Sequence, residues 1–378
     1  MARNALNCHG LPGVTLVRRW IRAGAVRRCT ELLSCAVLLA LVGAMAPQTA
    51  RGQQPDTRAM VIVVGAAGAE EFAPQFRDWA TQWQQAATAG GLRVQMIGLD
   101  PSDIAAKNAD ADLERERATD AADTTSAVNA REELQAALQS AGQTPLAEFW
   151  LVLIGHGSFD GQQSKLNLVG PDVSAEELAG WLEPLRPGHG LVVVNCASAS
   201  GGFVPALSGE RRVVLTATRS GSERNFARFG QYLASAIQPG GSDLDKDGQN
   251  SLLEAFLVAS QQTAGFYRDG ARLATEHALL DDNGDGRGIE ADWFAGTRVV
   301  RRSRAGEQVD GRLAHSLFLQ PPAAAANWDP ARQARREELE AQIEQLVAEK
   351  NEMAADDYYR QLEALLVPLA RLHETRQH

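Results

Sequence analysis

Cysteine is scarce in this 378-residue sequence, and its distribution excludes two kinds of protein. Only four cysteines are present, and three of them, Cys8, Cys29 and Cys35, lie in the first 50 residues. If that segment is removed, Cys196 is left alone and an intramolecular disulfide cannot form. No group of Cys and His residues has the spacing of zinc ligands, so we do not expect a zinc centre.

An apolar run long enough to cross a membrane is also missing. The run at 32–46 is shorter than the roughly 20 residues of a transmembrane helix, and Pro47 ends it. Arginines precede this run and small residues follow it, as in a secretory signal peptide. We therefore predict that residues 1–50 are a signal peptide and that the protein is exported, either periplasmic or secreted. No stable membrane insertion is expected after cleavage; an uncleaved anchor is the alternative interpretation.

Basic residues are few relative to acidic ones. The chain has 37 Lys and Arg against 47 Asp and Glu. Residues 1–50 hold six of the basic residues and one of the acidic ones, which leaves 31 against 46 and a net charge near −15 for the rest. Such a surface repels nucleic acid and anionic membranes, so neither is an expected partner. The glycines at 65–68 lack a Walker lysine and a complete G-x-G-x-x-G, so no organic cofactor is expected.

Two continuous apolar runs, 149–154 and 191–194, stand in the middle of the chain. Runs of this length are too short for helices, and nearby glycines bound them, which is typical of inner strands of a parallel sheet. The first run leads to His156 and the second to Cys196. Functional side chains gather at the carboxyl ends of neighbouring parallel strands. We therefore expect an imidazole and a thiol to face each other across one crevice, as a base and a nucleophile do.

The order of the remaining patterns predicts a doubly wound α/β domain over residues 58–300. Amphipathic periods alternate with further apolar strands, and Ser174 and Glu177 have the spacing of a helix capping box. The expected strands are 59–64, 93–97 and 212–217, and the expected helices are 76–83, 127–138, 174–182 and 226–237.

These patterns resemble the caspase–legumain group of cysteine peptidases, and legumain most. A strand followed by His156-Gly157-Ser158 precedes, by 40 residues, a strand that ends at Cys196. Leu215-Thr216-Ala217-Thr218, with Glu223 shortly after, is similar to the legumain segment that helps to build the substrate pocket. The resemblance implies a caspase-like, doubly wound and mainly parallel sheet flanked by helices.

The resemblance also implies an exported cysteine endopeptidase that acts on peptide or protein substrates. Cys196 would be the nucleophile, and His156 would act first as general base and then as general acid. The backbone N–H groups of Gly157 and Cys196 would form the oxyanion hole. On this hypothesis Cys196 is partly exposed, lies within reach of His156 and has a lowered pKa.

Three departures from the family pattern leave other interpretations open. Ala67 stands where legumain has the asparagine that orients the imidazole, and neither Arg219 nor Arg224 can be assigned as the pocket arginine. The residues after Cys196 also differ, and a shift of the alignment by two places Ser198 at the nucleophile position. In that alignment Cys196 is structural. The protein is then either a catalytically inactive, calcium-stabilised binding or assembly module, or an acyl hydrolase with a serine nucleophile.

An acidic loop at 243–254 has the pattern of an EF-hand. Oxygen ligands stand at loop positions 1, 3, 5, 9 and 12, and Gly248 stands at position 6. We predict a structural calcium ion here, because clustered carboxylates repel one another unless a cation intervenes; a helix cap is the alternative. The predicted ligands are Asp243, Asp245, Asp247, Gln249, Ser251 and Glu254.

Two more features complete the chain. Residues 281–292 begin as a second EF-hand-like loop, but Gly288 at position 8 and Asp292 at position 12 depart from the pattern. A second ion site and an Asx turn are both open there. Leucine stripes in residues 329–373 predict two amphipathic helices that form a helical hairpin beside the α/β domain. No pattern indicates an oligomeric state.

Overall fold

The structure, a computed structural model, describes residues 58–99, 129–301, 309–320, 330–348, 350 and 353–373. The predicted signal peptide at 1–50 lies outside these residues. All described residues belong to one unit of the chain, Gln54–His378. Within them, no helix combines the length and the apolar character that crossing a membrane requires.

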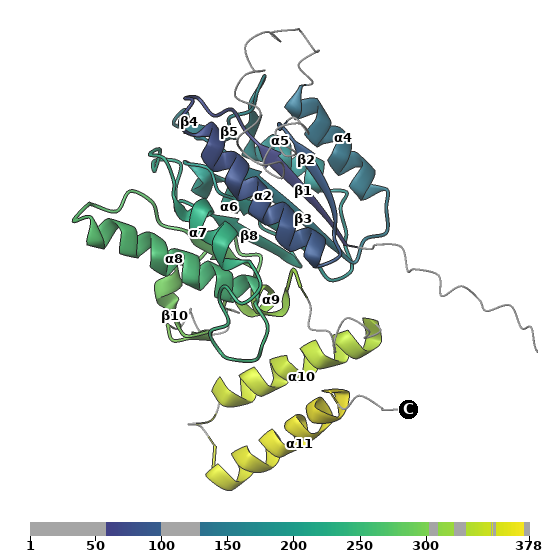
Figure 1. The fold of residues 1–378 in the computed structure, drawn as a ribbon. Helices are drawn as coiled ribbons and strands as arrows, with labels where there is room; N and C mark the ends of the chain where they lie inside the picture. Colours follow the sequence, from purple (N-terminus) through teal and green to yellow (C-terminus); the bar gives the residue numbers. More distant parts are fainter. Residues whose placement is uncertain are drawn as a thin grey trace, which may run out of the picture. The chain divides into compact units, whose positions relative to one another are not determined.

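A six-stranded sheet is the core of the α/β domain (Figure 1). Its strands, in spatial order, are β2 (Arg93–Ile97), β1 (Arg58–Val64), β3 (Glu148–Ile154), β7 (Gly190–Asn195), β8 (Arg212–Thr216) and β9 (Leu279–Asp281). The first five are parallel and β9 is antiparallel to β8. β3 and β7 are buried along their whole length, as their continuous apolar runs predict.

Helices cover both faces of this sheet (Figure 1). One face carries α2 (Ala73–Ala89), α7 (Phe229–Ala236) and α8 (Leu252–Asp269), and the other carries α4 (Ala130–Gly142), α5 (Ala175–Leu182) and α6 (Val204–Leu207). Val192 and Val194 of β7 pack on the first face, and Leu191 and Val193 pack on the second. This alternation follows from the two-residue period of a strand. The predicted α/β class, with a mainly parallel sheet flanked by helices, is confirmed.

The strand order places a switch point between β1 and β3. From β1 the chain moves outward to β2 and then returns to β3 on the other side of β1. In open α/β sheets, ligands bind in the crevice at the carboxyl ends of the strands beside such a point. The turn at Gly65 and the turn at His156 both lie there, because they directly follow β1 and β3.

A small antiparallel sheet follows β3 and fixes the backbone next to His156. It consists of β4 (Gly157–Phe159), β5 (Ser164–Leu166) and β6 (Val173–Ser174). Gly157 pairs with Leu166 of β5. After β6, the hydroxyl of Ser174 accepts the N–H of Glu177, and the Glu177 carboxylate accepts the N–H of Ser174. This confirms the predicted capping box at the start of α5.

The C-terminal part of the described chain is helical. The helices α10 (Pro330–Ala348) and α11 (Ala355–His373) pack against each other, as the leucine stripes predict. Leu339 and Leu346 are buried, whereas Leu366 is exposed. The remaining short elements are η1 (Ser200–Phe203), η2 (Ala291–Trp293), β10 (Phe294–Ala295), β11 (Arg298–Val299) and α9 (Arg312–Ser316).

Candidate functional site

The turns after β1 and β3 touch each other at the switch point. The N–H of Gly65 donates to the carbonyl of Ile154 at 2.8 Å, and the N–H of Ala66 donates to the carbonyl of Asn167 at 3.0 Å. A Cβ on Gly65 would lie 2.2 Å from the Asn167 carbonyl oxygen, which no side chain can accommodate. Glycine at this position therefore allows the close approach of the two turns.

His156 is held by one hydrogen bond and by three aromatic rings. Its Nε2 lies 3.1 Å from the carbonyl oxygen of Ala67, and because a carbonyl can only accept, Nε2 carries the proton and Nδ1 is the acceptor. Phe72, Phe76 and Phe226 surround the imidazole at centroid distances of 4.8, 5.2 and 5.9 Å. Burial lowers the pKa of His156, and the bond to Ala67 opposes this shift. The imidazole is therefore neutral at neutral pH, which is the form of a general base.

Residue 67 orients the imidazole although it departs from the legumain pattern. The alanine side chain cannot accept a hydrogen bond, but the backbone carbonyl of the same residue does. The sequence did not indicate the Ala67 carbonyl as a partner, because a comparison of residue types considers side chains and not backbone groups.

Ser198 is the hydroxyl residue that contacts the His156-Gly157 turn. The N–H of Gly157 donates to Ser198 Oγ at 3.0 Å, and Ser198 Oγ donates to the carbonyl of Gly157 at 3.1 Å. A Cβ on Gly157 would lie 2.1 Å from the Ser198 carbonyl oxygen, so this approach also requires glycine. Ser198 is 3% exposed. It is also the residue that the shifted alignment assigns to the nucleophile position.

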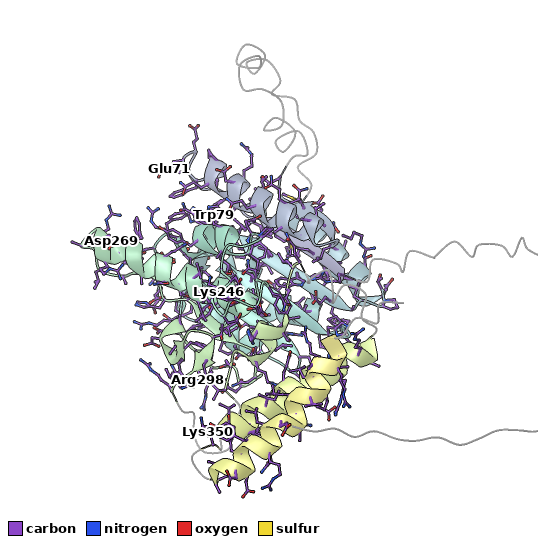
Figure 2. The ribbon with its side chains drawn as sticks, turned by 60° about the horizontal axis from the view of Figure 1, so that its bottom comes forward. Glu71, Trp79, Lys246, Asp269, Arg298 and Lys350 are labelled. Atoms are coloured by element: carbon purple, nitrogen blue, oxygen red, sulfur yellow. The ribbon has the colours of Figure 1, made fainter. Side chains whose placement is uncertain are left out.

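Cys196 lies in the apolar core instead. It is 1% exposed and belongs to the cluster beneath α2 and α7. Gly230 of α7 packs on it: a Cβ there would lie 2.6 Å from the Cys196 Cβ and 2.9 Å from Trp79 of α2, which Figure 2 labels. Burial, with a smaller contribution from the charge of Glu276, raises the pKa of the thiol to about 12. The prediction of a partly exposed thiol with a lowered pKa is wrong.

Strand periodicity explains the position of Cys196. Its N–H donates to the carbonyl of Leu153 at 2.8 Å, so the ladder between β3 and β7 includes it. Cys196 therefore points the same way as Val194, into the core. The same bond occupies the N–H that we expected in the oxyanion hole. Among the described residues, no hydrogen bond joins Cys196 to His156.

Ser200 attaches the turn after β7 to the end of β8. Its Oγ accepts the N–H groups of Ala217 and Thr218 at 3.1 and 3.2 Å, and the residue is fully buried. Between Ser198 and Ser200, Ala199 has a φ of 55°, in the left-handed region. This conformation costs a non-glycine residue about 1–3 kcal/mol. The buried Ser200 network stabilises the strained turn and thereby positions Ser198.

Glu223 connects this turn to two basic side chains. Its carbonyl accepts the N–H of Ala199 at 2.7 Å. Its carboxylate lies 2.6 Å from Nδ1 of His277 and 3.2 Å from Nε of Arg219. Arg219, a candidate pocket arginine in the sequence, is therefore already paired. The sequence did not indicate the partnership with His277, because the two residues are 54 positions apart and meet only in the fold.

The acidic loop at 243–254 brings three of its predicted ligands together. One carboxylate oxygen from each of Asp243, Asp245 and Asp247 lies within 4.8 Å of the others. Asp243 Oδ1 and Gln249 Oε1 are buried and have no hydrogen-bond partner among the described residues. Burial raises the pKa of Asp247, and the neighbouring carboxylates add to this effect. Buried acceptors without donors are what a cation would satisfy, so these residues fit calcium.

Ser251 and Glu254, the other two predicted ligands, form a capping box at the start of α8. Glu254 Oε2 accepts the N–H and the hydroxyl of Ser251 at 2.9 and 2.8 Å. Glu254 Oε1 accepts the N–H groups of Leu244 and Asp245 at 2.7 and 3.3 Å. These four bonds use the hydrogen-bonding capacity of a buried carboxylate. In this geometry Glu254 closes the loop through backbone N–H groups.

Comparisons with known proteins find similarity in structure only. No family model matches the chain, and no curated protein is similar to it. It is similar to caspase-1 from Spodoptera frugiperda, with 10% identity and a TM-score of 0.35 over 60% of this chain and 86% of that one. It is also similar to the Drosophila initiator caspase Dronc, with 12% identity and a TM-score of 0.36 over 63% and 84%. A Geobacter sulfurreducens protein shows 10% identity and a TM-score of 0.34 over 61% and 97%. At these identities the similarities say nothing about the chemistry of the site.

Proposed function

We propose that this chain is an acyl hydrolase of the caspase–legumain kind in which Ser198, and not Cys196, is the nucleophile. One observation carries the proposal: Ser198 Oγ accepts the N–H of Gly157, the residue that follows His156, at 3.0 Å, whereas Cys196 points into the apolar core. Cys196 is then a packing residue, as small buried cysteines commonly are.

His156 supplies the base in this mechanism. Its Nε2–H is held by the Ala67 carbonyl, so the lone pair of Nδ1 is the one that can take a proton. Nδ1 removes the Ser198 hydroxyl proton while Oγ forms a bond to the carbonyl carbon of the substrate. The imidazolium then returns the proton to the leaving group as the acyl bond breaks. Water repeats the same steps on the acyl-enzyme and releases Ser198.

The N–H of Gly157 is the expected oxyanion donor. In the structure it donates to Ser198 Oγ, and the hydroxyl in turn donates to the Gly157 carbonyl. During attack, Ser198 Oγ becomes bonded to the substrate, and the Gly157 N–H can donate to the developing oxyanion together with the backbone N–H of Ser198. The hydroxyl must therefore rotate away from the Gly157 carbonyl before it reacts.

The expected substrates are peptide or protein acyl groups, and the expected location is outside the cytoplasm. Both follow from the family resemblance and from the predicted signal peptide, and both belong to the proposal. We also propose a structural calcium ion held by Asp243, Asp245, Asp247 and Gln249. Hard oxygen ligands of this kind suit calcium, although Asp245 shares one oxygen with His315 Nε2 at 3.2 Å.

A catalytically inactive binding or assembly module is the second candidate. The observation that favours it is the saturation of the Ser198 hydroxyl, which both donates to and accepts from Gly157 in a residue that is 3% exposed. A hydroxyl held in this way is a structural clasp between the turns after β3 and β7.

Labelling with a fluorophosphonate separates the two candidates, because this probe reacts with activated serine hydroxyls. The wild type should be labelled, and peptide mapping should place the label on Ser198. Ser198→Ala should abolish labelling, whereas Cys196→Ala, a substitution of similar size two residues away in the chain, should retain it. Folded wild-type protein that takes no label would contradict the hydrolase proposal and favour the binding module. Circular dichroism of each variant checks the fold.

A further inference from the structure

Asp281, the last residue of β9, is a buried carboxylate with an unpartnered oxygen. The residue is fully buried, and its Oδ1 accepts the hydroxyl of Ser208 at 3.0 Å. Its Oδ2 is also buried, and no group of the described chain makes a hydrogen bond of good geometry to it. The N–H groups of Gly284 and Gly286 lie near enough to oppose, without cancelling, the rise that burial causes in the pKa of Asp281. Such an oxygen is costly unless a proton or a cation satisfies it.

Two buried aspartates nearby serve the backbone instead. Asp282 accepts the N–H groups of Gly311 and Ala314, both at 2.9 Å, and so caps α9. Asp310 Oδ1 accepts the N–H groups of Asp282 and Asn283 at 2.8 and 3.0 Å. Each of these carboxylates accepts two backbone N–H groups, and within the described part of the chain neither has an oxygen that is buried without a partner, as Oδ2 of Asp281 is.

The loop after β9 closes over the Asp281 carboxylate. Ser208 Oγ, while donating to Asp281, accepts the N–H of Gly286 at 3.0 Å, so the carboxylate and the loop share one hydroxyl. Gly284 and Gly286 have φ values of +83° and +73°. A Cβ on Gly284 would lie 3.2 Å from the backbone of Gly209, so the loop lies tightly on the segment that follows α6.

Asn283 and Asp285 add oxygen atoms two and four residues after Asp281. Asn283 Oδ1 accepts the N–H of Asp285, and Asp285 Oδ1 accepts the N–H of Arg287, both at 2.8 Å. Both side chains therefore turn back into the loop. The spacing repeats that of residues 243, 245 and 247, whose carboxylates converge.

We propose that Asp281, Asn283 and Asp285 bind a hard divalent cation, of which calcium is the representative probe. Carboxylate and amide oxygens are the ligands that such ions prefer, and Asp281 Oδ2 provides the buried anionic ligand. Asp292, at position 12 of the sequence pattern, does not belong to the site, because its carboxylate binds Arg301 at 2.6 Å. The site is separate from the 243–254 loop and does not depend on the chemistry of Ser198.

Counting the calcium ions bound to the full chain tests this site. Native mass spectrometry after chelation and calcium addition gives the number per chain. Asp285→Asn should bind one ion fewer than the wild type. Asp292→Asn, which removes another exposed carboxylate from the same segment, should bind as many as the wild type. Asp247→Asn should lose a different ion, so the double variant Asp247→Asn/Asp285→Asn should lose both.

A neutral substitution separates ligation from charge. Asn283→Ala changes no charge but removes a proposed ligand. In the Asp247→Asn background, which lacks the other proposed ion, it should weaken calcium binding at least tenfold in a calorimetric titration. Equal stoichiometry in wild type and Asp285→Asn would overturn the proposal. Equal loss in Asp292→Asn would overturn it too, because the effect would then be one of general charge. Labelling of Ser198, measured on the same samples, reports on the hydrolase proposal separately.

Discussion

The turn after β7 and the acidic loop before α8 both carry predicted chemistry, and the two predictions fared differently. In the turn, the predicted exposure of Cys196 is wrong, because Cys196 lies in the core. Ser198 is the residue that contacts Gly157. In the loop, the three aspartates converge as their spacing predicts. The loop is shaped by bonds between residues two apart, such as Asp247 N–H to Asp245 Oδ1 at 3.2 Å. The end of a strand is shaped by a neighbouring strand that is distant in sequence.

This comparison separates two kinds of motif. A loop motif contains its own hydrogen-bond partners, so its spacing is informative by itself. A catalytic motif at a strand end depends on where the hydrogen bonds to the neighbouring strand stop. A residue that makes one more of these bonds continues the strand, so its side chain follows the alternation of the strand and can point into the core. Four experiments test this distinction at the turn and at the loop.

The largest effect is expected for His156→Ala. Removal of a general base slows reaction by about 10²–10⁴-fold, so the rate of fluorophosphonate labelling at Ser198 should fall by this amount. Cys196→Ala should change the rate less than about threefold, well below that range. The labelling rate followed by mass spectrometry provides the measurement. An equal loss in both variants would show that Cys196 takes part in the reaction, and the comparison between Cys196 and Ser198 would fail.

Calcium is expected to stabilise the acidic loop next in magnitude. An ion that binds only the folded state stabilises it by about 2.7 kcal/mol at a hundredfold excess over its Kd. Thermal unfolding should therefore shift upward with calcium and downward with chelator, and Asp247→Asn should reduce both shifts. Glu254→Gln should instead destabilise the protein by about 1 kcal/mol with or without calcium, because an amide nitrogen in place of Oε1 cannot accept the N–H groups of Leu244 and Asp245. If calcium does not change the unfolding midpoint of the wild type, the loop is only a helix cap.

Cys196→Ser tests the packing role of the thiol. The serine hydroxyl would be buried among apolar side chains without a partner, which costs about 1–3 kcal/mol in the free energy of unfolding. Urea denaturation of this variant and of Cys196→Ala measures the difference, with Cys196→Ala as the matched control that adds no polar group. If the serine variant is as stable as the wild type, Cys196 is not packed in a dry core.

The smallest effect concerns pH. Burial lowers the pKa of His156 below its ordinary value of 6.5. Protonation removes the acceptor at Nδ1, so the labelling rate should fall as the pH decreases, with a midpoint below 6.5. Phe72→Ala, which opens the aromatic wall beside the imidazole, should move the midpoint upward. A profile without an inflection below 6.5 would mean that His156 does not act as the base.

Much of the fold was predictable because its signals are local. Continuous apolar runs identified β3 and β7, and the Ser174–Glu177 spacing identified the start of α5. The site was only partly predictable. His156 and Gly157 follow directly from a strand end and a glycine, but the Ala67 carbonyl and the pairing of Glu223 with His277 involve no side-chain pattern. Contacts made by a backbone carbonyl or across 54 residues leave no trace in local spacing.

The sequence by itself determined that a parallel sheet would carry an imidazole at one strand end and small reactive side chains at the next, and that three aspartates would gather in one loop. These outcomes depend on periodicity and on bonds between near neighbours. Only the tertiary structure distinguished the surroundings of Cys196 from those of Ser198. The ladder bond from Cys196 to Leu153 turns the thiol into the core beneath α2 and α7, whereas the Ser198 hydroxyl exchanges hydrogen bonds with the backbone of Gly157. Cys196 and Ser198 are only two residues apart, and the last hydrogen bond between the two strands, at Cys196, gives them different surroundings.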